Sequence, residues 1–334
     1  MVISLVIGTL ASFIVYKIAL NHTATYTKIL NGEVVNKERV RVSCEHSYQI
    51  CTGSGESRSC TTHYRHSHDY DWWVRTNVGD VKIDRVNDRG DRMPPRFNQV
   101  VIGEPAAIPH RYLNFAKSAQ HSLYQPVPMD NSIDRNKLPQ YPRVFDYYRA
   151  NRVLSIEYNL SNRNEWNDML LETLKNVGPR YKLNTILVFV SAERFPERFA
   201  EQLRSHWEGA EHNDVIIIIA KDQQEQVQWT RVMSDTVHSI FNVSLSDDIN
   251  RSGTLSPIDF QRLFVNNVKE HFKLTPIENY DYLKNEVQLS TFTKTVSSII
   301  IIVLTLLLSK FFSTRHTEIP FFSTRMHKRR TYRR

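Results

Sequence analysis

The chain has 334 residues, a mean hydropathy of −0.43 and a formal net charge of +8. This length supports one or two sizeable cores, and the negative hydropathy excludes a protein that lies mostly within a membrane. From Lys310 onward, eight Lys or Arg stand against one acid, so this end carries +7 and the other 309 residues sum to +1. We therefore expect no nucleic-acid binding by the folded region.

Each end of the chain carries an apolar segment. Residues 1–20 hold no charge before Lys17, and about 20 residues cross roughly 30 Å of hydrocarbon. Residues 291–312 surround a run of Ile and Leu, with Lys294 and Lys310 placed to snorkel. We predict a transmembrane anchor at 1–20 and a transmembrane helix at 291–312. The alternatives are a cleaved signal peptide and a buried core helix, respectively.

The segment 313–334 follows the second apolar stretch and is strongly basic. Basic residues beside a span favour the cytoplasmic side, so we predict a basic cytoplasmic tail and a cytoplasmic N-terminus. Residues 21 to about 290 then lie outside the cytoplasm. The repeated motif at Phe311–Arg315 and Phe321–Arg325 suits an anionic membrane surface, or a disordered solubilising tail.

Residues 21–102 are predicted to be rich in β-structure. Asn31-Gly32 is a strong two-residue hairpin signal, and short strands are expected on either side of Gly79. Residues 103–150, rich in Pro, Asn and Ser, predict an irregular connection.

Residues 151–290 predict an α/β domain. Two unbroken apolar runs, 185–190 and 215–219, enclose a helix expected from Pro196 to Trp207. This βαβ unit implies parallel neighbouring strands that are covered on both faces. Gln226–Val232 predicts a third strand.

Three further helices are expected in this region. The first begins with a capping box at Asn162 and Glu165 and is stopped by Gly178-Pro179. The second begins at Ser256, and a last helix, from about Pro276 to Val287, leads to the membrane.

The segment 199–219 resembles the TPM domain, found in membrane-tethered bacterial and chloroplast proteins. More broadly, residues 30–290 resemble a group of membrane proteins from tailed bacteriophages. The matching stretches are Phe199-Ala200, Leu203, Trp207, Gly209 and Asn213-Asp214 for the TPM domain, and 39–60, 70–75, 93–96, 102–105, 114–116 and 184–248 for the phage group.

These resemblances imply a phage-encoded protein of the host inner membrane. The fold expected is mixed α+β and α/β: N- and C-terminal transmembrane helices flank a β-rich segment and a TPM-like α/β domain containing the βαβ unit. In the phage group the turn after Trp is Gly-Gly-Lys-Lys-Asn-Asp. Here it carries Glu211-His212, so the basic turn is absent.

A Cys- and His-rich patch lies between residues 44 and 68. In an oxidising compartment we predict a disulfide between Cys51 and Cys60, which would staple the loop between them. The alternatives are free thiols or a zinc site that uses the Cys44-x-His46 and Cys60-x-x-His63 spacings.

Asp214, Asp222 and Asp235 are the candidate metal ligands. Asp214 and Asp222 bracket an apolar strand, and open α/β sheets place ligands at strand ends, so these carboxylates are candidates to hold Ca²⁺ or Mg²⁺. The alternative is that the acids serve as helix caps and turn residues. No Gly-rich phosphate loop, HExxH or GxSxG motif is present in the sequence.

Two functions follow. The first is a membrane-anchored envelope protein that displays the TPM-like domain for partner binding or scaffolding. The second, implied by the phosphatase activity and divalent-metal binding of some TPM proteins, is a metal-dependent phosphatase-like hydrolase.

Overall fold

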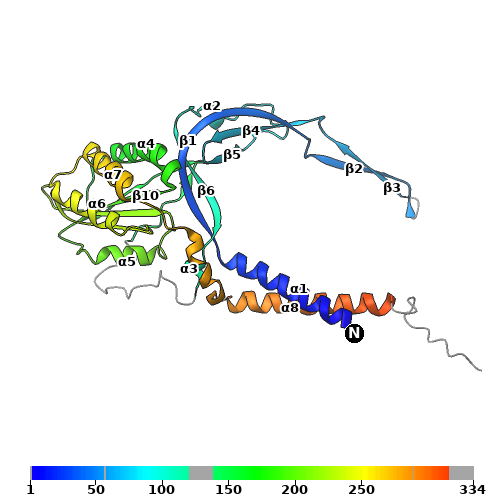
Figure 1. Cartoon of the computed structure of the whole chain (residues 1–334). Coiled ribbons are helices and arrows are strands. Elements are labelled where there is room, and N and C mark those ends of the chain that lie inside the picture. The colour runs from blue at the N-terminus through cyan, green and yellow to red at the C-terminus, as the bar shows by residue number, and fades with distance from the viewer. Residues whose placement is uncertain (1, 56–57, 120–137, 288, 316–334) are drawn as a thin grey trace, which may run out of the picture.

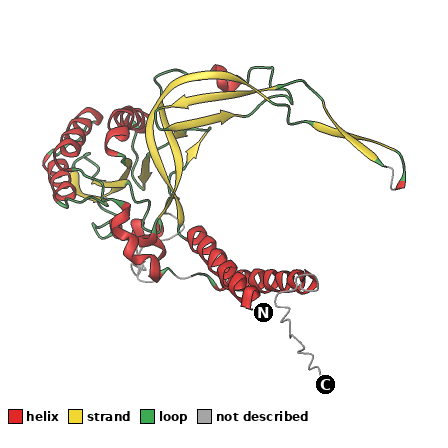
Figure 2. Cartoon of the chain, turned by 45° about the vertical axis from the view of Figure 1, so that its right-hand side comes forward, coloured by secondary structure: helices red, strands yellow, loops and turns green. Residues whose placement is uncertain are grey.

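The protein is described by a computed structural model covering residues 2–55, 58–119, 138–287 and 289–315. Within these ranges it has two four-stranded sheets, a protruding β-hairpin and a pair of long helices (Figures 1 and 2). The mixed α/β character is as predicted. The basic tail predicted at 313–334 lies outside the described residues from 316 onward.

The first sheet is antiparallel and has the order β5-β4-β1-β6. Its central strand β1 is 18 residues long, so its first half pairs with β6 and its second half with β4. Trp72 and Val74 of β4 pack with Val34 of β1 in the core of this sheet. The bounds are β1 Thr25–Val42, β4 Asp69–Thr76, β5 Gly79–Ile83 and β6 Pro105–Leu113, with the short helix α2, Pro95–Asn98, beside them.

The hairpin turn predicted at Asn31-Gly32 is wrong, because β1 runs straight through it with Asn31 opposite Ala107. Both residues serve tertiary contacts instead. The Asn31 side chain donates to the carbonyl oxygen of Leu183 at 3.2 Å. A Cβ on Gly32 would lie 2.0 Å from Asn77 Oδ1, so this glycine permits a close approach and not a turn.

The prediction of an irregular connection over 103–150 is wrong for Pro105–Leu113, which form strand β6. This strand includes Pro105 and Pro109 and still pairs with β1 along its length. It lies at the edge of the sheet, where a missing N–H can face away from the ladder. The short strands β7, Val144–Phe145, and β8, Arg149–Ala150, and the one-turn helix α3, Phe115–Ser118, also fall in this region.

The second sheet has the order β12-β11-β10-β9 and contains the predicted βαβ unit. Strands β9, β10 and β11 are parallel, and β12 closes the edge antiparallel to β11. Every residue of β10 and β11 is buried, which confirms two covered faces. The bounds are β9 Val153–Ile156, β10 Asn184–Ser191, β11 Asp214–Lys221 and β12 Val227–Ser234.

The two faces of this sheet are covered by different helices (Figure 1). Leu187 and Ile217 point into the core formed with α4, α6 and α7, while Val188 and Ile218 point toward α5. Side chains alternate along a strand, so one continuous apolar run supplies both cores. The bounds are α4 Arg163–Tyr181, α5 Phe199–His206, α6 Ile240–Arg251 and α7 Pro257–His271.

The helix predictions hold in part. Ser256 caps α7 as predicted, with its hydroxyl accepting from the N–H of Asp259. Gly178-Pro179 does not stop α4, which continues to Tyr181. Asn162 makes no capping bond to the backbone and binds the Glu165 carboxylate instead. Sequence patterns missed α6, and the last predicted helix is the 3₁₀ helix η3, Ile277–Glu286.

Helices α1, Val2–Thr23, and α8, Thr291–Arg315, are in contact and extend together from one side of the molecule (Figures 1 and 2). A small apolar cluster holds their base, with Ala19 and Leu20 packed near Leu283 and Val287. Among the described residues, one helix is long and apolar enough to cross a membrane, over Thr291–Phe311. A second span at 1–20 remains a prediction.

Candidate functional site

The feature that stands furthest from the two cores is a two-stranded hairpin, which we call the arm. It consists of β2, Ser47–Thr52, and β3, Ser59–Tyr64, which pair with each other and with no other described strand (Figure 1). Nearly all its residues are exposed. An isolated hairpin is at best marginally stable in water, so the arm needs support other than a hydrophobic core.

One support is covalent. Cys51 and Cys60 are directly opposite each other in the two strands and form a disulfide, the pairing expected from the sequence. The third cysteine, Cys44, is free and buried. Residues 56 and 57 of the stapled loop lie outside the described residues.

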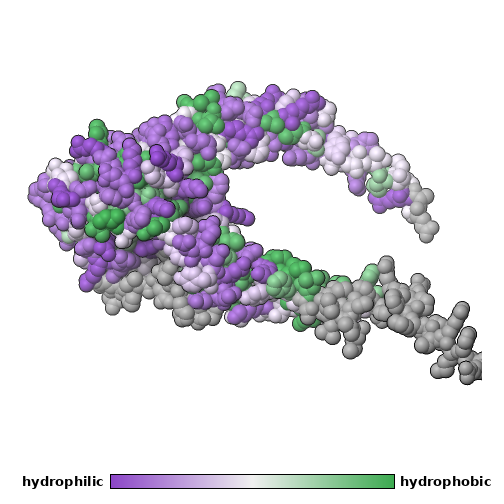
Figure 3. Space-filling view, viewed as in Figure 1, coloured by the Kyte–Doolittle hydropathy of each residue, from purple (hydrophilic) through white to green (hydrophobic). Residues whose placement is uncertain are grey.

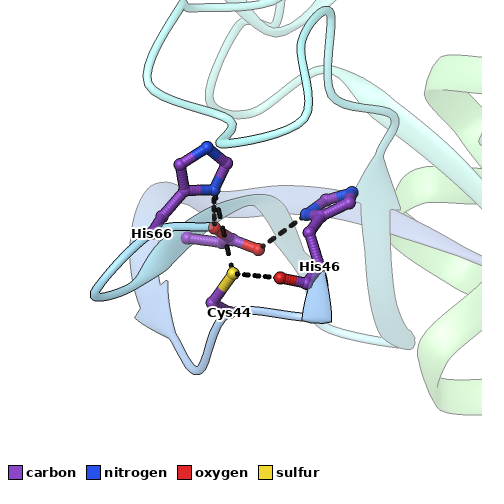
Figure 4. Close-up of side chains that lie close together, drawn as sticks. Cys44, His46 and His66 are labelled. Atoms are coloured by element: carbon purple, nitrogen blue, oxygen red, sulfur yellow. Dashed lines mark hydrogen bonds and ion pairs between the residues drawn. The ribbon is translucent and has the colours of Figure 1, made fainter. Parts of the chain in front are cut away.

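A cluster of four side chains lies at the base of the arm (Figure 4). Cys44 and His46 belong to the connection that leaves the body after β1. His66 and Asp69 belong to the return from β3 into β4. The cluster is thus where the two connections of the arm meet, and one ligand atom from each residue lies within 4.8 Å of the others.

The distances within the cluster are short. The Cys44 sulfur lies 3.8 Å from His66 Nδ1, and His66 Nδ1 lies 3.1 Å from Asp69 Oδ1. His46 Nδ1 lies 3.4 Å from Asp69 Oδ2. This nitrogen is buried and makes no hydrogen bond to any described residue. Sulfur, imidazole nitrogen and carboxylate oxygen are the donor types that Zn²⁺ accepts.

Asp69 is the most constrained member of the cluster. Its side chain is fully buried, and Oδ2 accepts from the N–H of Glu45 at 3.0 Å and faces Arg85 at 3.3 Å. Burial alone would raise the pKa of this carboxyl, but the bonds from Glu45 and His66 and the charge of Arg85 hold it below the ordinary value. Asp69 is therefore ionised at neutral pH. Arg85 is also paired with Asp71.

The predicted carboxylate site is not formed. Asp214 and Asp222 lie at opposite ends of β11, about eight residues apart at roughly 3.3 Å per residue, so they cannot share an ion. Asp235 follows β12 and binds His212 Nδ1 at 3.2 Å. In the described part of the chain, the group of ligand atoms close enough to hold a metal is the cluster at the arm.

Asp214 and Asp222 each serve a structural role. Asp214 is buried and accepts from Asn184 Nδ2 at 2.7 Å and from the Tyr141 hydroxyl at 2.8 Å; burial raises its pKa against these bonds. Asp222 closes a turn by accepting from the N–H groups of Gln224 and Gln226. Asp222 therefore has the turn role that was the alternative to metal binding, whereas Asp214 holds buried side chains together.

A separate polar cavity of about 750 Å³ lies between the start of β1 and the turn before β11. On its wall, Glu211 accepts from the Tyr112 hydroxyl at 3.1 Å and lies 3.5 Å from Lys117 Nζ. Burial raises the pKa of Glu211 to about 7, although Lys117 opposes the shift. Glu211 thus titrates near neutrality.

Sequence patterns identified half of the cluster. The Cys44-x-His46 spacing predicts two of the ligands, but the predicted zinc site combines them with Cys60 and His63. Cys60 is in the disulfide, and His63 stacks on Tyr48 along the arm. The sequence predicts no ligand role for His66, which lies in the same Cys- and His-rich patch, or for Asp69, the buried first residue of β4.

Comparisons with known proteins add no assignment. No protein-family model matches the chain, and neither a curated protein nor a solved structure matches it.

Proposed function

We propose that the protein is a phage-encoded membrane anchor that displays its TPM-like domain and its arm outside the cytoplasm of the host for partner binding or scaffolding. The observation that carries the proposal is the pairing of α1 with α8. The two helices leave the body together, and the start of α1 and the end of α8 lie at the same far end (Figures 1 and 2). Two spans would therefore place both termini on one side of a membrane.

The surface of the helix pair supports a lipid environment. The side chains of Ile302, Leu306 and Leu307 in α8 are each more than half exposed. Figure 3 shows an apolar patch on this pair, in contrast to the mostly polar body. Exposed apolar patches of this kind mark membrane or protein contact sites. The basic residues after α8 favour the cytoplasm for both ends.

The arm supports a role in binding. Neither of its strands contains an Asp, Glu, Lys or Arg, and both outer edges are unpaired among the described strands. Natural proteins usually protect edges with charge or proline, because an open edge pairs readily with another strand. Tyr48, Ile50 and Tyr64 are about half exposed or more on this hairpin. The arm extends toward the same side of the molecule as the helix pair (Figure 1).

Thiol labelling in intact host cells tests the topology. A membrane-impermeant reagent should modify a Ser54→Cys variant and spare a Thr331→Cys variant until the membrane is opened. The parent chain is the control, because its Cys44 is buried and the other two cysteines are bonded. Labelling of Thr331→Cys alone would contradict the proposal.

Site-specific photocrosslinking tests the binding role. A crosslinker at Tyr48 on the arm should give a discrete adduct in infected cells, whereas one at Tyr282, exposed on η3, should not. Equal yields at the two positions would contradict a role of the arm in binding.

The hydrolase alternative gains no support from this geometry. It needs Asp214, Asp222 and Asp235 to converge on one ion, but Asp222 lies at the opposite end of β11 from the other two.

A further inference from the structure

The arm joins the body through two short connections that have little core of their own. One runs from the end of β1 to β2 and the other from β3 to β4. The direction of the arm is therefore set by whatever holds these connections together. Cys44 and His46 come from the first connection, and His66 and Asp69 from the second and its junction with β4.

We propose that these four side chains bind one Zn²⁺ ion, which clamps the two connections and fixes the arm on the body. In a tetrahedral zinc site with bonds of about 2.0–2.3 Å, neighbouring ligand atoms lie about 3.3–3.6 Å apart. Two of the separations, 3.8 Å from Cys44 Sγ to His66 Nδ1 and 3.1 Å from His66 Nδ1 to Asp69 Oδ1, bracket these values. One ligand atom from each of the four residues lies within 4.8 Å of the others. Small side-chain shifts are enough to complete the site.

The donor set selects the metal. A thiolate and two imidazoles are poor ligands for Ca²⁺ and Mg²⁺, which take oxygen. Zn²⁺ accepts sulfur, nitrogen and oxygen in one tetrahedral shell. Cys44 and Asp69 supply two negative charges as ligands, which balance the charge of the ion once the thiol of Cys44 releases its proton. Arg85 beside Asp69 also pairs with Asp71, an acid that it shares with Lys82.

Surrounding groups already orient the ligands. The backbone N–H of Glu45 and the Arg85 guanidinium both contact Asp69 Oδ2, which leaves Oδ1 toward His66. Such outer contacts fix metal ligands before the metal arrives. The contact of His46 Nδ1 is weaker: this buried nitrogen lies 3.4 Å from Asp69 Oδ2 as an ion pair and makes no hydrogen bond to any described residue.

The site goes beyond the proposed binding function, because it concerns how the arm is held and not what it binds. Its tests use the full-length chain in detergent and need neither a partner nor a membrane topology. Failure of one proposal is therefore distinguishable from failure of the other.

Metal content gives the first test. The purified chain, stripped with a chelator, loaded with Zn²⁺ and gel-filtered, should retain one zinc per chain by elemental analysis. In metal sites generally, replacing a group that only hydrogen-bonds to a ligand costs about 10–100-fold in metal affinity. Losing a ligand itself in Cys44→Ser or His66→Gln should therefore cost at least as much. The matched control is His63→Gln, a histidine on the arm outside the cluster, which should bind zinc like the parent.

Cobalt gives a readout that does not depend on a variant folding. Co²⁺ in the parent chain should show the strong visible bands of a tetrahedral site and a near-ultraviolet thiolate charge-transfer band. Cys44→Ser should lose the charge-transfer band. A parent spectrum without thiolate bands, zinc well below one per chain, or unchanged affinity in both ligand variants would overturn the proposal.

Proteolysis tests the clamp. Arg65 is exposed and directly precedes His66, so trypsin should cut there in the stripped protein. Zinc should slow this cleavage in the parent and in His63→Gln but not in His66→Gln. Cleavage at Arg65 that is unaffected by zinc in the parent would overturn the structural role.

Discussion

Asn31, in the middle of β1, donates a hydrogen bond at 3.0 Å to the side-chain oxygen of Asn184, the first residue of β10. Asn184 in turn donates to Asp214 Oδ1 at 2.7 Å. The relay is buried and joins the two sheets through one amide. Asn213 reinforces the junction by donating to the carbonyl oxygen of Ile29 at 2.7 Å. Matched polar groups thus join the β-rich part to the α/β part.

Because of this relay, we expect Asn184→Ala to lower the free energy of unfolding substantially. The substitution leaves the Asn31 amide and the Asp214 carboxylate without a buried partner, which should lower the free energy of unfolding by about 3 kcal/mol. Thermal unfolding of the detergent-solubilised chain by circular dichroism measures the effect. Asn176→Ala, on the exposed face of α4, is the control and should change little. Equal midpoints for the two variants would contradict the relay.

Gly178 predicts a second stability effect. A Cβ at this position would lie 2.7 Å from the backbone oxygen of Asn31, because α4 approaches β1 closely there. Alanine has the better helix propensity, but the clash involves backbone and cannot be relieved by a rotamer. We expect Gly178→Ala to destabilise the protein by about 1–3 kcal/mol in the same thermal assay. A higher unfolding midpoint would show that the contact is loose.

Glu211 predicts how stability depends on pH. Burial raises its pKa from 4.5 to about 7, so between these values the folded state holds a proton that the unfolded state has released. The contribution of Glu211 to the free energy of unfolding is therefore fully present below about pH 4.5 and is lost as pH rises toward 7. This loss is on the order of 2–3 kcal/mol. Unfolding midpoints measured from about pH 5 to pH 8 should show this decline in the parent.

Glu211→Gln should flatten that part of the profile, because the amide does not titrate. Glu208→Gln removes a carboxylate from an exposed position three residues earlier and should keep the parent's decline. A profile for Glu211→Gln that matches the parent would contradict the assignment.

The buried sheet predicts that Ile217→Asp prevents folding of the α/β domain. Ile217 is fully buried in β11, and an unpaired carboxylate there should cost several kcal/mol. The matched control is Ile258→Asp, since Ile258 is 74% exposed in the first turn of α7, where an acid is favourable. Near-ultraviolet circular dichroism should be lost for the first variant alone. Retained near-ultraviolet signal in Ile217→Asp would contradict burial on both faces.

Local patterns suffice for the parts of the fold in which neighbours along the chain decide the outcome. The apolar runs at 185–190 and 215–219 specify two buried strands, because side chains that point to both faces are all apolar. Ser256-Pro257 marks the start of α7 through a cap and a preset φ. Cys51 and Cys60 flank a short Gly- and Ser-containing loop, which brings them opposite each other.

Long-range contacts decide the rest. Asn31-Gly32 has the signature of a turn, but both residues make contacts with distant parts of the chain. The Asn31 amide bonds to Asn184, 153 positions away. The lack of a Cβ on Gly32 lets Asn77, 45 positions away, approach closely. β6 forms despite its prolines because β1 offers a partner.

The two metal predictions differ for the same reason. Asp214 and Asp222 are near in sequence, but the strand between them holds them apart. Cys44 and Asp69 are separated by a whole hairpin, and the pairing of its strands brings them together. A strand extends the chain while a hairpin returns it to its origin, so only the tertiary structure determines which distant ligands meet.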